Sequence, residues 1–241
     1  MHPAVAENGA ASTGGAAADS SSAAKRLREL RASMLECARC AALVRCRSRV
    51  VPGDGAAPAA VAFVGLAPGR LGGDRTGIPF SGDRSGNLLR RMIASAGIQD
   101  GFVTNLVRCN PRDARGRNRD PSAREIANCR AHLAAELALV RPRVVVCLGA
   151  IAWRELAGNK LRFAPRGRKS RPMGTPLLYP IYHPGYVIRG AYSERAYARD
   201  FKRLQQLLRS LDTFEGARMH TQALSAQRAA ERPPNPDESQ K

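Results

Sequence analysis

The stretch Val61–Gly86, VAFVGLAPGRLGGDRTGIPFSGDRSG, decides the fold of this chain. It opens with a short apolar run, Val61–Val64, which is typical of a buried strand. The glycines of Gly65–Gly82 then predict a loop whose backbone can approach a ligand closely and adopt positive φ angles. We expect the chain to turn at Ser85 into a helix over Gly86–Ala96. The stretch therefore predicts a strand, a ligand-binding loop and a helix, although it contains neither of the phosphate motifs GxGxxG and GxxxxGK[ST].

The alternation of strand and helix continues along the chain. Further strands are expected at Gly101–Cys109, Val144–Leu148 and Leu177–Tyr182, and further helices at Ala23–Glu36, Ser122–Val140, Ala150–Leu156 and Glu194–Leu211. This order predicts an α/β fold: a single domain with a mostly parallel four-stranded sheet and helices on both faces, in three α/β/α layers. We expect the domain at residues 23–213, with disordered tails at 1–22 and 214–241.

The composition indicates a nucleic-acid-binding protein of the cytoplasm. Lys and Arg number 39 against 20 Asp and Glu, and the net charge of +19 favours a polyanionic partner such as nucleic acid. We find no apolar run long enough to span a membrane and expect no secretory signal. Six cysteines without such a signal favour metal ligands or free thiols over disulfides. We therefore expect a monomer without membrane contact in the cytoplasm, in a bacterium the cytosol or nucleoid.

Polar and aromatic side chains gather where the expected strands end. The glycine-rich loop, which carries Phe80 and Asp83, leaves the first strand. Asn105 and Cys109 lie near the end of the second strand, and His183 follows the fourth. Because ligands of parallel sheets bind beyond the carboxyl ends of the strands, this edge predicts a site with a carboxylate, an amide, an imidazole and an aromatic ring. Asp83 could instead only cap the helix that follows it, and Asn105 only the end of its strand.

Four of the six cysteines have the spacing of a metal site. Cys37 and Cys40 form a CxxC pair, and Cys109 and Cys129 can complete a set of four thiolates. Four thiolates suit either zinc or a [4Fe–4S] cluster, and the spacing alone does not separate the two. Cys147, in the third expected strand, is predicted to be a buried core thiol.

Four short motifs together resemble the iron–sulfur uracil-DNA glycosylases. They are GLAPG at 65–69, RTG-x-PF-x-GD-x-SG at 75–86, TNLVRC at 104–109 and His-Pro at 183–184. The resemblance covers roughly residues 35–210, is strongest to the branch called family 5 or type b, and includes features of family 4. This chain departs from the family pattern at Leu66, where family 4 carries Glu, and at Gly185, where the second motif commonly carries Ser.

The resemblance implies a role for each matching residue. It implies a [4Fe–4S] cluster held by Cys37, Cys40, Cys109 and Cys129. The implied catalytic residues are Asp83 and His183, and the implied base-binding residues are Gly65, Leu66, Ala67, Phe80 and Asn105. The implied DNA-binding residues are Arg75, Arg84, Tyr186 and Arg189.

The implied activity is excision of uracil from DNA, which leaves an abasic site. The base must flip out of the stack, where an aromatic ring can stack on it and an amide can read its O4 and N3–H. A carboxylate can stabilise the positive charge that develops on the sugar, and an imidazole N–H the negative charge on the departing base. We expect uracil to be preferred, with weaker activity on other deaminated bases, and the basic loops at 108–119 and 162–171 to follow phosphates.

Two alternative hypotheses belong to other functional classes. The first is a non-catalytic iron–sulfur protein of the same fold that binds nucleic acid, and the presence of both Asp83 and His183 argues against it. The second is an iron–sulfur redox protein, which the single cysteine set and the lack of flavin or nicotinamide motifs make less favourable.

Overall fold

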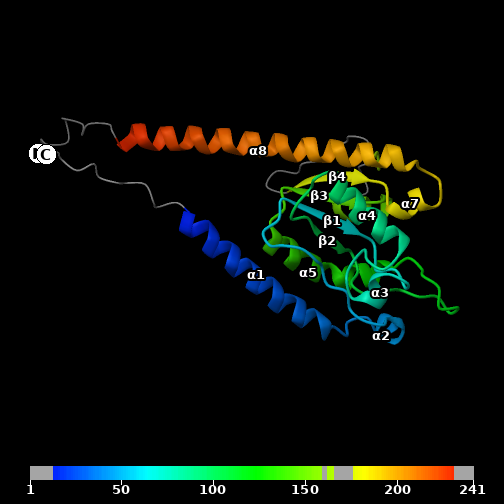
Figure 1. The fold of residues 1–241 in the computed structure, drawn as a ribbon. Coiled ribbons are helices and arrows are strands. Elements are labelled where there is room, and N and C mark those ends of the chain that lie inside the picture. Colours follow the sequence, from blue (N-terminus) through cyan, green and yellow to red (C-terminus); the bar gives the residue numbers. More distant parts are fainter. Residues whose placement is uncertain (1–12, 159–161, 166–175, 231–241) are drawn as a thin grey trace, which may run out of the picture. The chain divides into compact units, whose positions relative to one another are not determined.

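The computed structural model describes residues 13–158, 162–165 and 176–230 (Figure 1). The chain divides into two compact units, residues 1–201 and 202–241, and helix α8, Glu194–Ala230, continues from the first unit into the second. None of the helices in these ranges has the length and apolar character that crossing a membrane requires. Every site considered below lies in the first unit.

The first unit is built on a four-stranded parallel sheet. Its strands are β1 (Val61–Gly65), β2 (Phe102–Asn105), β3 (Val144–Leu148) and β4 (Leu177–Ile181), in the order β2-β1-β3-β4. All residues of these strands are buried, as expected for a sheet covered on both faces. The chain continues from β1 to β2 on one side and then crosses to β3 on the other, so the strand order reverses between β1 and β3. A crevice for a ligand is expected at such a switch point.

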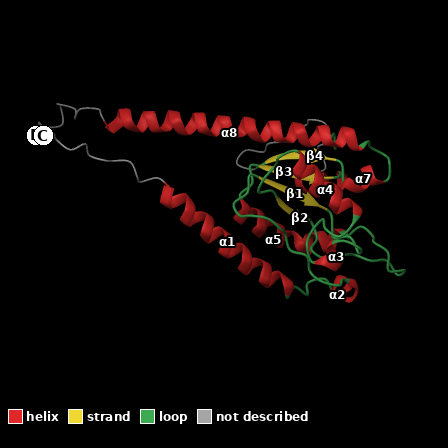
Figure 2. Ribbon diagram, viewed as in Figure 1, coloured by secondary structure: helices red, strands yellow, loops and turns green. Residues whose placement is uncertain are grey.

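Helices cover both faces of the sheet, which confirms the predicted fold class (Figure 2). On one face, α1 (Thr13–Leu35), α5 (Ala123–Val140) and α6 (Ala150–Ala157) share a core with inward residues of the strands, and this core includes Trp153. On the other face, Phe63 of β1 stacks on Phe201 of α8, with 6.1 Å between the ring centroids. Helix α4 (Arg84–Ser95) lies on this second side and buries Leu88, Leu89 and Met92.

Several element boundaries differ from the sequence-based predictions. Strand β2 ends at Asn105 rather than Cys109, and the amides that follow it bond to the end of β1 and the loop after it: Leu106 N donates to Gly65 O at 2.8 Å and Val107 N to Leu66 O at 3.0 Å. The first helix begins at Thr13, since an alanine-rich segment continues it upstream of Ala23, and α8 extends to Ala230. The short helices α2 (Ala41–Cys46), α3 (Gly73–Thr76) and α7 (Pro184–Ile188) were not expected. The domain limits at 22 and 213 stay predictions.

A buried ion pair fixes the chain where it leaves β2. Glu136 of α5 and Arg108 are almost fully inaccessible to solvent and pair through Oε2 and Nη2. The other carboxylate oxygen, Oε1, accepts from Gly53 N at 2.7 Å, and Oε2 also accepts from Thr104 Oγ1 at 2.7 Å. Arg108 Nη1 donates to the backbone oxygens of Asn105 and Leu106. The pair therefore joins α5, β2 and the segment before β1.

We expect Glu136→Gln to lower the free energy of unfolding by about 3–5 kcal/mol, because it keeps the side-chain size but leaves the charge of Arg108 buried and uncompensated. Urea denaturation followed by circular dichroism measures the change. Glu29→Gln is the matched control: Glu29 lies 4.0 Å from Lys25 on the exposed side of α1 and should contribute little. Equal midpoints for the two variants would contradict this expectation.

Candidate active site

A cavity of about 460 Å³ opens at the carboxyl ends of the strands. Its walls come from the loops that follow β1, β2, β3 and β4, so it occupies the expected switch point. Seven of the residues proposed from the sequence line it: Leu66, Ala67, Phe80, Asp83, Asn105, His183 and Arg189. The fold therefore brings together the carboxylate, amide, imidazole and aromatic ring that the sequence placed at this edge.

The ring of Phe80 and the amide of Asn105 meet above Gly65. A Cβ atom at Gly65 would lie 2.4 Å from the Phe80 ring and 2.6 Å from Asn105 Oδ1, so only glycine leaves room for both. Phe80 itself has a φ of 50°, in the left-handed region that a phenylalanine rarely adopts. Gly65 does not line the cavity but allows its floor to form.

The side chain of Asn105 is buried and has no hydrogen-bond partner. It is 1% exposed, and neither Oδ1 nor Nδ2 is bonded within the described part of the chain. Burying an amide without partners costs free energy, so such a group in a cavity wall indicates that a ligand supplies the partners. The proposal that Asn105 only caps a strand end receives no support from these contacts.

His183 lies opposite Phe80, with 5.7 Å between the ring centroids. Its Nδ1 accepts a hydrogen bond from Gly185 N at 3.0 Å, so the proton of the neutral ring belongs on Nε2. Burial, and to a smaller extent the nearby charge of Arg189, lower the pKa of His183 to about 4, while the charge of Asp83 opposes the shift. His183 is therefore a neutral imidazole at pH 7 that can donate through Nε2.

Asp83 both caps a helix and lines the cavity. Its Oδ1 accepts from Gly86 N at 2.7 Å, which makes Asp83, not Ser85, the N-cap of α4. The second oxygen, Oδ2, faces the glycine-rich loop: a Cβ at Gly72 would lie 2.2 Å from it. Capping thus uses one carboxylate oxygen and leaves the other on the side of the loop.

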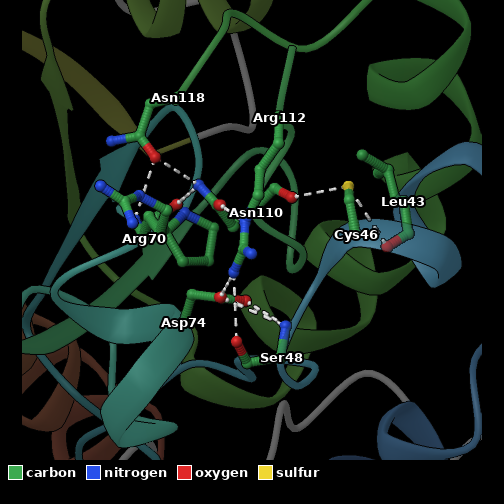
Figure 3. Close-up of polar contacts among 9 residues, drawn as sticks. Leu43, Cys46, Ser48, Arg70, Asp74, Asn110, Arg112 and Asn118 are labelled. Atoms are coloured by element: carbon green, nitrogen blue, oxygen red, sulfur yellow. Dashed lines mark hydrogen bonds and ion pairs between the residues drawn. The ribbon is translucent and has the colours of Figure 1, made fainter. Parts of the chain in front are cut away.

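A polar network fastens the loop after β2 to the glycine-rich loop (Figure 3). Asn110 Nδ2 donates to Pro68 O at 2.7 Å and to Asn118 Oδ1 at 2.9 Å, and both asparagines line the cavity. Arg112 Nη2 pairs with Asp74 Oδ2 at 2.5 Å, and Asp74 is fully buried. Asp74, a second carboxylate of the glycine-rich loop, is held in this ion pair and is not among the described residues that line the cavity.

The residues expected to contact DNA are exposed around this region. Arg75 of α3, Arg84 of α4, and Tyr186 and Arg189 near α7 all lie at the surface, and of these only Arg189 lines the cavity. Tyr186 stacks on the ring of Tyr182, with 4.9 Å between centroids. In the basic loop expected at 162–171, residues 166–171 lie outside the described residues.

The four cysteines of the expected metal site surround one small second cavity. Cys37, Cys40, Cys109 and Cys129 line it together with His132 and Arg47. Each sulfur has a nitrogen neighbour: His132 Nε2 lies 3.3 Å from Cys37, Asn128 Nδ2 3.4 Å from Cys40, Arg47 Nη1 3.1 Å from Cys109, and Arg108 N 3.4 Å from Cys129. The structure thus surrounds all four sulfurs with polar nitrogens.

The other two cysteines differ. Cys46 Sγ donates to the backbone oxygens of Leu43 and Asn110, and Cys147 is fully buried in β3, as expected for a core thiol.

Within the described ranges, no group of three or more His, Cys, Asp or Glu side chains is arranged to hold a single metal ion. A four-iron cluster has a different requirement, since each thiolate binds its own iron atom and the sulfurs stand around a larger body. The polar surroundings fit thiolate ligands, because N–H groups stabilise their charge.

Several residues that contribute to these two sites were not predicted from the sequence. Asn110, Asn118 and Arg119 line the main cavity although only the arginine-rich character of their loop was noted. His132 could have been found, because it follows Cys129 by three residues and so shares its face of α5. Asn110 carries no comparable signal, since its role depends on Pro68, which is far away in the sequence.

A parallel α/β sheet with a polar cavity at its switch point defines an α/β protein with a candidate ligand-binding site at the carboxyl ends of its strands. Residues 52–209 match the family model described as the uracil DNA glycosylase superfamily, and the chain belongs to this family. It is 32% identical over 190 residues to a type-4 uracil-DNA glycosylase of Archaeoglobus fulgidus, covering 72% of this chain and 89% of the relative. It is 35% identical over 184 residues to a type-5 uracil-DNA glycosylase of Pyrobaculum aerophilum, covering 63% of this chain and 79% of the relative.

The buried His183 gives a pH dependence of stability. Between about pH 6.5 and 4 the unfolded chain binds a proton on this residue and the folded chain does not, so stability decreases as the pH falls through this window. We expect the melting temperature of the wild type to fall more steeply from pH 7.5 to pH 5 than that of His183→Gln, measured by circular dichroism. Parallel curves for the two proteins would show that His183 titrates normally.

Proposed function

We propose that this protein excises uracil from DNA by hydrolysing the N-glycosidic bond, and that it leaves an abasic site. The observation that carries the proposal is the unpartnered amide of Asn105 in a cavity that also contains Phe80, His183 and Asp83. Membership of the uracil DNA glycosylase superfamily supports it. An amide offers one donor and one acceptor side by side, and the O4 and N3–H of uracil complement this pair while cytosine presents the opposite pattern.

In this proposal the flipped base enters between Phe80 and the cavity wall. Extrusion makes the base accessible, and stacking on the ring offsets part of the lost stacking in DNA. Asn105 then bonds the Watson–Crick edge, where only a base with an acceptor and an N–H in the right order satisfies both of its atoms. A wrong base leaves the buried amide without partners, and the free-energy cost of this state selects against that base.

His183 and Asp83 divide the charge that develops as the bond breaks. The departing base gains negative charge, and the neutral imidazole of His183 stabilises it by donating from Nε2. The sugar gains positive charge, which the second oxygen of Asp83 stabilises directly or through a water that it orients. Leu66 lines the cavity at the position where family 4 carries Glu, so Asp83 is the carboxylate that this proposal uses.

We propose uracil as the preferred base, with weaker excision of other deaminated bases. The similarity to both type-4 and type-5 enzymes supports a range between the two. DNA contacts are assigned to Arg75, Arg84, Tyr186 and Arg189, which are exposed on the same unit as the cavity. The chain's excess of 39 basic over 20 acidic residues favours binding to phosphates.

We also propose that Cys37, Cys40, Cys109 and Cys129 hold a [4Fe–4S] cluster. The N–H groups around the four sulfurs and the iron–sulfur branch that the motifs resemble support this assignment. Burial raises the pKa of the Cys109 thiol to about 11 and also raises that of Cys129, so a bound cation is needed to keep both ionised at pH 7. When bound, the cluster would join the start of the domain to the loop after β2 and to α5, and it would add no redox chemistry to the proposed reaction.

The activity is tested on an oligonucleotide with one uracil, by alkali cleavage of abasic sites and gel electrophoresis. We expect the wild type to cleave the uracil-containing strand and to leave a strand with cytosine at that position intact. Asn105→Ala should lower single-turnover excision by roughly 10²-fold or more without weakening binding to an abasic-site strand, because that strand offers no base to read. Asp83→Asn keeps a capping oxygen and should also bind the abasic strand while excising slowly.

No cleavage by the wild type would overturn the proposed activity. Equal losses of excision and abasic-site binding in Asn105→Ala would make Asn105 a structural residue. Excision by Asp83→Asn at the wild-type rate would restrict Asp83 to its capping role.

The cluster assignment predicts iron content. We expect about four irons per chain and broad visible absorption in protein prepared without air, and loss of both in Cys129→Ser. Cys46→Ser is the matched control, because Cys46 lies near the same region but its sulfur donates to carbonyl oxygens. Zinc in place of iron, or equal iron in the two variants, would be incompatible with the assignment.

A further inference from the structure

Arg90 holds the backbone of Phe80 in its unusual conformation. Arg90 lies near the middle of α4, and its Nε donates to Phe80 O at 2.9 Å and its Nη2 to Pro79 O at 2.8 Å. These are charge-assisted bonds to a segment whose φ of 50° at Phe80 is otherwise disfavoured. Gly86 leaves the space for this approach, since a Cβ there would lie 2.4 Å from Phe80 C.

The same guanidinium is tied to strand β2 through Asp54. Arg90 Nη2 donates to Asp54 Oδ2 at 2.9 Å. Asp54 in turn pairs with Val103 by two backbone bonds, N to O, of 2.9 and 2.8 Å. Val103 lies in β2 two positions before Asn105. Arg90 therefore connects the loop that carries the stacking ring with the strand that carries the unpartnered amide.

We propose that Arg90 and Asp54 form a clamp that sets the distance between the Phe80 ring and the Asn105 amide, and so determines how selectively the cavity accepts uracil. The proposal rests on the proposed function, because it concerns the same cavity. Neither residue is among the described residues that line this cavity, so both act through Phe80 as positioning residues. The side chains of Arg90 and Asp54 are 39% and 44% exposed, so the ion pair itself contributes little to folding stability.

The test compares Arg90→Gln with Arg91→Gln. Arg91 is the next residue of α4 and pairs with Glu194 at the surface, so both variants lose one positive charge on the same helix. Two quantities are measured: single-turnover excision of uracil, and the ratio of affinities for strands carrying 2′-fluoro-2′-deoxyuridine, which resists cleavage, or cytosine. Affinity for an abasic-site strand reports the contacts that do not involve the base. Asp54→Asn tests the other end of the clamp. Arg90→Lys tests whether a positive charge without the planar guanidinium is enough to keep excision and the affinity ratio.

We expect Arg90→Gln to lower excision and the affinity ratio by roughly 10- to 100-fold, since misplacing a substrate-positioning group by about 1 Å can cost 10²-fold. Asp54→Asn should show a smaller loss, Arg90→Lys only partial rescue, and Arg91→Gln values within about twofold of the wild type. Abasic-site binding should stay unchanged in all of them. The clamp would be overturned if Arg90→Gln and Arg91→Gln had the same excision rate and affinity ratio. It would also be overturned if Arg90→Gln weakened binding to the abasic-site strand as much as binding to the uracil strand. A wild type without excision activity would instead contradict the proposed function, and the affinity ratio would still test the clamp.

Discussion

The ion pair between Glu136 and Arg108 is the interaction on which the rest of the structure depends. Two charges removed from water carry a large desolvation cost, which is offset only where the remaining donors and acceptors are also satisfied. Here one carboxylate accepts from Gly53 N and Thr104 Oγ1 as well as from the guanidinium, and Arg108 Nη1 donates to two backbone oxygens. Arg108 Nε is buried without a hydrogen-bond partner in the described part of the chain, so the cost is offset in large part but not fully. The pair thereby fixes the chain between Asn105 and Cys109, so that the unpartnered amide of the main cavity and one cysteine of the thiol group are only four residues apart.

The distribution of charge follows the same logic throughout the first unit. The buried acidic residues include Asp74, Glu125 and Glu136, and each is paired with an arginine: Arg112, Arg119 and Arg108 respectively. Arginine suits such positions because its planar fork can satisfy several acceptors at once. Each of these pairs uses one basic and one acidic residue, so the basic excess of the chain is left for the other side chains, where it favours a polyanionic partner.

The sequence predicted the sheet and the composition of the cavity, because both depend on local patterns. Buried runs such as Val144–Leu148 identify parallel strands, and the carboxyl ends of parallel strands share one edge, which brought Asp83, Asn105 and His183 together in the cavity. The start of α5 was predicted for the same reason, and its capping box between Ser122 and Glu125 is present in the structure. The wrong cap at Ser85 shows the limit: Asp83 and Ser85 are both good caps, and only the path of the loop decides between them.

Features that depend on distant contacts could not be predicted. The unusual φ of Phe80 occurs where its ring packs against Gly65 and its carbonyl accepts from Arg90. Neither contact produces a periodic pattern in the sequence by which it could be predicted. The same is true of the ion pair between Asp74 of the glycine-rich loop and Arg112, because the two residues are far apart in the sequence. The N–H groups around the four sulfurs also come from separate segments, except for Asn128 and His132, which neighbour Cys129 on α5.

The arrangement of the four cysteines has a consequence for how the protein is made. Cys37 and Cys40 leave the ribosome early, at the end of α1, while Cys129 lies on α5, which is synthesised after both β1 and β2. Synthesis proceeds at about 5–20 residues per second, so several seconds pass between the synthesis of Cys40 and that of Cys129. During this time the first two cysteines have no complete set of partners. The cysteine group can close only after β1, β2 and the first two turns of α5 have been made, so it cannot assemble before these two strands have been synthesised.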